Sequence, residues 1–124
     1  MANNSILDQI ESGQVARLIP TVADSKREER ATSSLLAAFM VVPIFAQKVL
    51  SATSAPSGTR VKINCYTEIV FKSKGAKRPR PDGLLIATMG ARTWSAIIES
   101  KIGNAELRRD QLEEYLDLAR EVGI

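Results

Sequence analysis

The chain has 124 residues, 44% hydrophobic and 25% charged, which is typical of one small globular domain. Its formal net charge is only +3, so nucleic-acid binding would have to depend on local clusters of cations. There is no histidine and one cysteine, which excludes Ser-His-Asp triads, histidine-based zinc sites and an internal disulfide. Carboxylates, lysines and a hard metal ion remain as the available chemical groups.

Cys65 and the apolar segments indicate the cellular setting. Cys65 lies in an alternating apolar and polar run, where we expect it to be buried in a strand, and the absence of disulfides favours a reducing, cytoplasmic compartment. No secretory signal is visible near the start of the chain. The most apolar stretch, residues 33–45, is short and contains Pro43, so we expect it to be core and predict no membrane span.

Residues 1–25 are predicted to be a helical extension. Apolar side chains between positions 6 and 19 are compatible with a short helix that breaks near Gly13 and ends at Pro20. The main domain is then residues 26–124. It should open with a helix over residues 26–50, where apolar side chains recur at helical spacing and where Pro43 should kink or divide the helix.

Three strands and a second helix follow in the predicted order of an α/β domain. Alternation over residues 60–71 predicts a half-buried strand, and residues 72–80 form a basic loop. Residues 83–88 and 93–102 are predicted to be two further strands joined by a turn around Gly90. The helix over residues 108–122 has an apolar inner stripe.

Three charged residues converge in this arrangement. Glu99 and Lys101 are two apart in the third predicted strand, so their side chains should project from one face of the sheet. Asp82 precedes the neighbouring strand, which should pair antiparallel and bring Asp82 toward Glu99. Two carboxylates can hold Mg²⁺, and Lys101 can activate water or offset charge on a phosphate. Alternation turns Trp94 to the opposite face.

Pro81-Asp82 followed by Glu99-Ser100-Lys101 resembles the signature of the PD-(D/E)XK superfamily of restriction-type nucleases and Holliday-junction resolvases. The resemblance covers residues 26–124. It implies a restriction-endonuclease-like core of helix, three-stranded β-meander, helix and a final strand, and we expect the final strand to be missing because no sequence remains for it. It also implies that Asp82 and Glu99 bind Mg²⁺ or Mn²⁺ and that Lys101 activates water.

Further positions extend the resemblance. Gln111 and Tyr115 resemble the Gln-x-x-x-Tyr motif of RecB-like members, which implies that they contact DNA or support the site. The resemblance also implies an acid on the first helix, for which Glu29 is the natural candidate and Glu28 and Glu68 are alternatives. The basic loop offers phosphate contacts through these cations: Lys77, Arg78 and Arg80.

The leading hypothesis is therefore a Mg²⁺-dependent nuclease that hydrolyses DNA phosphodiester bonds. One alternative is a module of the same fold that binds nucleic acid without turnover. Another is a small α/β scaffold whose exposed sheet edge mediates formation of a homodimer and whose charged residues are merely solvated. The last alternative predicts that Asp82, Glu99 and Lys101 lie apart.

Overall fold

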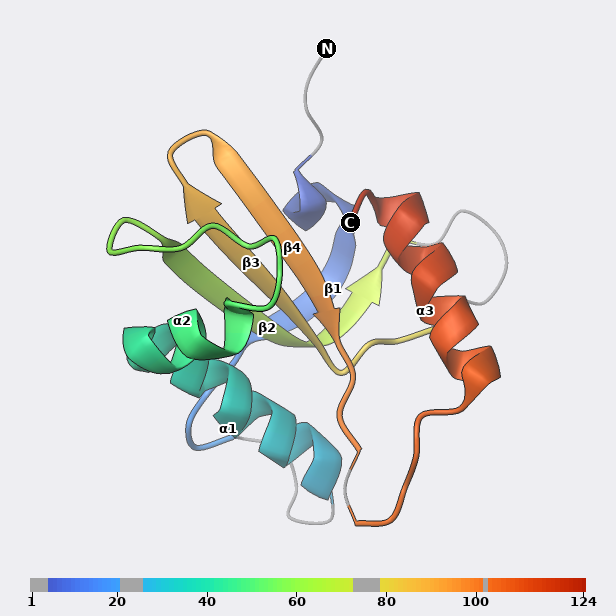
Figure 1. Ribbon diagram of the computed structural model, residues 1–124. Helices are drawn as coiled ribbons and strands as arrows, with labels where there is room; N and C mark the ends of the chain where they lie inside the picture. Colours follow the sequence, from blue (N-terminus) through green and yellow to red (C-terminus); the bar gives the residue numbers. More distant parts are fainter. Residues whose placement is uncertain (1–4, 21–25, 73–78, 102) are drawn as a thin grey trace.

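A computed structural model describes residues 5–20, 26–72, 79–101 and 103–124 (Figure 1). These residues form one antiparallel sheet in the order β1-β2-β3-β4. Two helices, α1 (Arg27–Val41) and α2 (Pro43–Leu50), lie on one face, and α3 (Arg109–Val122) lies on the other. The strands are β1 (Ile10–Val15), β2 (Lys62–Phe71), β3 (Gly83–Met89) and β4 (Arg92–Ile98). The predicted α/β class and the meander of β2, β3 and β4 are confirmed.

The predicted division of the first long helix at Pro43 is also confirmed. Helix α1 ends at Val41, and Pro43 begins α2, where its missing N–H is not needed for a helical hydrogen bond. The two helices meet at an angle of 105°. Among the described residues no single helix is long and apolar enough to cross a membrane, although this bent pair would qualify by length and composition alone.

The predicted N-terminal helix is wrong, because this segment contributes an edge strand. A short 3-10 helix, η1 (Ile6–Gln9), leads into β1, which pairs antiparallel with β2. The Ser33 hydroxyl bonds both the N–H and the carbonyl of Arg17, at 2.8 and 2.9 Å, so the segment after β1 is also tied to α1. Strand β1 therefore extends the same sheet as the rest of the described chain, and Ala16, which follows it, packs in the same core.

Strand β2 changes face at Glu68. Glu68 has a φ of +54°, in the left-handed region, and the pairing with β1 is irregular there, with Ser12 opposite Val70 but Gln14 opposite Thr67. As a result Cys65 faces α1 and α2, whereas Ile69 faces α3. Uninterrupted alternation would have placed both side chains on one face of the sheet. The predicted alternation is therefore wrong beyond Thr67.

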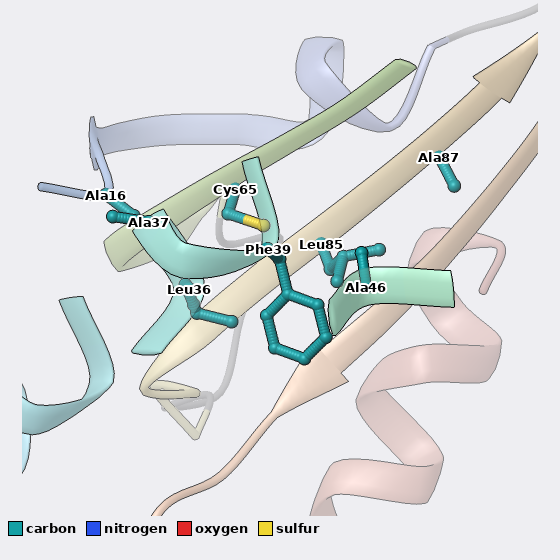
Figure 2. Packing of buried hydrophobic residues seen from close by; sticks show 8 residues of the cluster. All are labelled: Ala16, Leu36, Ala37, Phe39, Ala46, Cys65, Leu85 and Ala87. Carbon is teal, nitrogen blue, oxygen red and sulfur yellow. The ribbon is translucent and has the colours of Figure 1, made fainter. Parts of the chain in front are cut away.

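Two apolar clusters fill the spaces between sheet and helices. Figure 2 shows the cluster beneath α1 and α2, which contains Leu36, Phe39, Cys65 and Leu85. The second cluster joins the sheet to α3 and includes Leu118. Cys65 is fully buried, as predicted, and burial raises the pKa of its thiol to about 12, so it is a packing residue rather than a nucleophile.

Helix α1 approaches β3 closely at Gly83. A Cβ atom at this position would overlap Cδ1 of Leu36, which is itself fully buried, and would crowd the carbonyl of Tyr66. The absence of a side chain at Gly83 therefore lets α1 lie against the start of β3. This contact fixes the helix next to Asp82, the preceding residue.

The left-handed backbone at Glu68 predicts that glycine is preferred over alanine at this exposed strand position. Glu68→Gly should be more stable than Glu68→Ala by about 1 kcal/mol, because a Cβ atom is disfavoured at positive φ. At Asn64, an exposed β2 residue without a positive φ, the order should reverse, with the alanine variant more stable. Urea unfolding measures both pairs. An alanine variant at Glu68 as stable as the glycine variant would contradict this backbone conformation.

Candidate active site

The ends of β3 and β4 bring the predicted acidic residues together. The ladder between these strands begins with Gly83 opposite Ile98, so Asp82 and Glu99 continue from paired positions. Asp82 Oδ2 accepts a hydrogen bond of 2.7 Å from the Ser100 N–H. The predicted approach of Asp82 to the Glu99 end of the neighbouring strand is confirmed.

Glu99 has two partners at one carboxylate oxygen and none at the other. Its Oε1 lies 3.4 Å from Lys101 Nζ and accepts a 3.3 Å hydrogen bond from Gln111 Nε2. Its Oε2 is buried and has no hydrogen-bond partner. A carboxylate oxygen in that position is costly unless a proton or a cation neutralises it.

The predicted proximity of Glu99 and Lys101 is confirmed, but the predicted reason for it is wrong. Strand β4 ends at Ile98, so both residues lie in the segment that leaves the sheet, and their ion pair rather than strand alternation brings them together. The alternation prediction holds within the strand itself. Trp94 and Ile98 pack against the cluster under α1 and α2, and Ile97 packs on the α3 side.

The pKa of Asp82 reflects the burial of its side chain and the negative charges beside it. Burial is the largest cause that raises the pKa of its carboxyl group, to about 6, and the negative charges of Glu99 and Glu28 add to the effect. The Ser100 N–H opposes it by stabilising the charged form. A protonated Asp82 can donate a hydrogen bond to the Glu99 carboxylate, so Asp82 resists becoming charged beside it.

Helix α3 supplies the two residues of the Gln-x-x-x-Tyr pattern. Gln111 contacts Glu99, and the Tyr115 hydroxyl donates a 3.0 Å hydrogen bond to the carbonyl of Arg80. Burial and the nearby Glu99 charge raise the pKa of the Tyr115 hydroxyl, which keeps it protonated. Both side chains therefore brace the site, one at Glu99 and the other at the segment before Asp82. Their contact with DNA stays a prediction.

The first turn of α1 faces Asp82. Glu29 and Asp82 line a cleft of about 240 Å³ together with Glu68 and the cations Lys26 and Arg80. Glu28 does not line the cleft, yet its charge acts on Asp82. Within the described ranges no three acidic, cysteine or histidine side chains gather closely enough to hold a metal ion, so neither Glu29 nor Glu68 completes a three-acid group with Asp82 and Glu99.

The residues present nevertheless fit a hard divalent cation. Mg²⁺ in phosphate-processing sites is commonly held by one or two carboxylates, with water and substrate oxygens as its other ligands. The unpartnered Glu99 Oε2 and the raised pKa of Asp82 both indicate that the Lys101 ammonium, which lies at Glu99 Oε1, does not neutralise the two carboxyl groups fully. Asp82 and Glu99 are therefore the two residues that could bind such a cation.

Of the predicted basic contacts, Arg80 is exposed and lines the cleft. Lys77 and Arg78 lie outside the described residues. Sequence reasoning missed Ser100, which occupies the variable position between Glu99 and Lys101 and is the donor to Asp82. Only the register of the strands could have indicated it, since a lone serine carries no signal of its own. Comparisons with protein-family models, curated proteins and solved structures gave no match.

The raised pKa of Asp82 predicts that this group lowers the stability of the protein as the pH rises, which is the reverse of the usual effect of a carboxyl group. Between the unfolded value of 3.8 and about 6 the native state binds more protons than the unfolded state, so stability should fall as the pH rises through this range. Asp82→Asn removes this charge but keeps an oxygen for the Ser100 N–H. At pH 7 the free energy of unfolding of Asp82→Asn should exceed that of the wild type by about 1 kcal/mol, a figure reduced for the partial solvent exposure of Asp82.

Urea unfolding of both proteins from pH 4 to pH 8 measures this difference. The advantage of Asp82→Asn should be smallest near pH 4, where the native wild-type carboxyl is mostly neutral and the unfolded one, with a pKa of 3.8, is only partly ionised. An Asp82→Asn protein that is less stable at pH 7, or an advantage that does not change with pH, would contradict the paired-carboxyl description.

Proposed function

We propose that the protein is a metal-dependent nuclease that hydrolyses DNA phosphodiester bonds, with Asp82, Glu99 and Lys101 as its catalytic residues. The observation that carries the proposal is the buried, unpartnered Oε2 of Glu99 beside the Asp82 carboxyl, whose pKa is raised to about 6. Two neighbouring carboxylates whose charge is not balanced by the one lysine, 3.4 Å from Glu99, are uncommon on protein surfaces. The same three groups are suited to the hydrolysis of a phosphodiester bond.

Asp82 and Glu99 would hold Mg²⁺ or Mn²⁺. When bound, the ion would supply Lewis acidity to a phosphate oxygen and lower the pKa of water. The protein's own residues account for the rest of the chemistry. Gln111 holds Glu99 Oε1, and the Ser100 N–H holds Asp82 Oδ2, so both carboxylates are oriented before a substrate arrives.

Lys101 is suited to the charge that develops during hydrolysis. Its ammonium is paired with Glu99 and its side chain is about a quarter exposed, so it can reach a phosphate at the mouth of the site. There it would stabilise negative charge on the phosphate oxygens and orient the attacking water through a hydrogen bond. Arg80 and Lys26, which line the cleft beside Asp82, would bind the backbone phosphates on either side without reading sequence.

Nicking of supercoiled plasmid DNA tests the catalytic proposal. The wild type should nick in the presence of Mg²⁺ or Mn²⁺ and stop when EDTA is added. Lys101→Ala should reduce the rate at least about 100-fold, in the range of other lost transition-state contacts. Lys62→Ala is the matched control, because Lys62 pairs with Thr88 at the opposite end of the β2–β3 ladder, and it should cut at the wild-type rate.

Equal rates for the Lys101 and Lys62 variants would overturn the role of Lys101. A wild type that binds DNA but never cuts it with either metal would contradict the nuclease proposal and favour the non-catalytic nucleic-acid-binding alternative. A size measurement on the same preparation reports whether the chain forms the homodimer that the scaffold alternative predicts.

A further inference from the structure

Thr32 connects helix α1 to the candidate site. Its side chain is buried, with a relative exposure of 1% for the residue, and its Oγ1 lies 2.8 Å from the Ser100 Oγ. Ser100 stands between Glu99 and Lys101 and donates its N–H to Asp82. We propose that Thr32 is a positioning residue of the metal site, acting through Ser100 on both carboxylates. This inference rests on the proposed function.

The protons in this network have one consistent arrangement. Thr32 Oγ1 is also 2.8 Å from the carbonyl oxygen of Glu28, which can only accept a hydrogen bond. Because the threonine hydroxyl has a single proton and gives it to that carbonyl, the hydrogen between the two hydroxyls comes from Ser100. Ser100 therefore donates twice, from its hydroxyl to Thr32 and from its N–H to Asp82.

This arrangement matters because the segment after β4 has lost the support of the sheet. The last ladder pair is Gly83 with Ile98, so the peptide that carries Glu99 and Ser100 lies beyond the paired strand. The hydroxyl pair fixes Ser100 against a rigid helix. The Thr32 methyl group also lies beside Gly83, within 3.4 Å of where a Cβ atom there would stand. Thr32 thus touches the neighbours of both acids.

A hydroxyl that served only the helix would need no second partner. Threonine in a helix commonly bonds the carbonyl four residues earlier, and Thr32 already does so with Glu28. The contact with Ser100 is additional and reaches a residue 68 positions away. Loss of a comparable outer contact to a metal-binding residue typically weakens metal affinity by about 10-fold to 100-fold.

The test compares Mn²⁺ affinity of the full chain, by calorimetry, for the wild type and four variants. Thr32→Val keeps the shape but removes the hydroxyl, and Ser100→Ala removes the same hydrogen bond from the other side. Both should weaken Mn²⁺ binding about 10-fold or more. Thr32→Ser retains the hydroxyl and should stay close to wild type. Ser33→Ala removes a neighbouring buried hydroxyl that bonds Arg17 instead, so it should lose stability but not affinity.

A second readout does not depend on metal. In the metal-free protein the amide proton of Ser100 should show the downfield chemical shift of a hydrogen bond to a carboxylate, and Thr32→Val should move it upfield and speed its exchange. An unchanged Ser100 amide, or equal Mn²⁺ losses in Thr32→Val and Ser33→Ala, would overturn the role of Thr32. If the Ser100 amide changes as expected in Thr32→Val but the wild type binds no Mn²⁺, the proposed function is overturned instead.

Discussion

The end of the β3–β4 ladder is the constraint on which the rest of the site depends. Gly83 pairs with Ile98, and the next residue outward on each strand carries a carboxyl group. Both helix layers converge on this end, since α1 packs on Gly83 while α3 reaches Glu99 and the Arg80 carbonyl. The fold therefore holds Asp82 and Glu99 together even though their charges repel, and burial, with this repulsion added, raises the pKa of Asp82.

Such a pair of carboxyl groups lowers the folding stability of the protein, which is understandable if the pair has a function. Asp82 and the unpartnered oxygen of Glu99 both disfavour the metal-free native state, and Glu68 adds a left-handed backbone at the wall of the cleft that Asp82 lines. Unfavourable features gathered in one place are more typical of functional sites than of ordinary surfaces. Their concentration beside Lys101 and Arg80 supports the proposed phosphodiesterase chemistry.

The sequence predicted the parts of this fold in which local patterns decide the outcome. Proline chemistry predicted the break at Pro43, and apolar stretches around a turn predicted β3 and β4 and hence the approach of Asp82 to Glu99. It failed where tertiary contacts decide. Strand β1 is an exposed edge whose side chains show no alternation, so its pairing with β2 left no periodic signal. The bulge at Glu68 inverted the faces of β2, and the residue with the positive φ there is a glutamate rather than a glycine. The link from Thr32 to Ser100 joins residues 68 apart, beyond any local pattern.

The most direct test of the central claim is a crystal structure of the protein grown with Mn²⁺, with anomalous diffraction used to locate the ion. The account predicts an anomalous peak bound by carboxylate oxygens of both Asp82 and Glu99, at about 2.1–2.2 Å as expected for a small hard cation. It also predicts that the peak is absent in Asp82→Asn crystals grown in the same way. Mn²⁺ bound elsewhere with no density between these two residues, or a wild-type structure in which the two carboxyl groups lie apart, would contradict it.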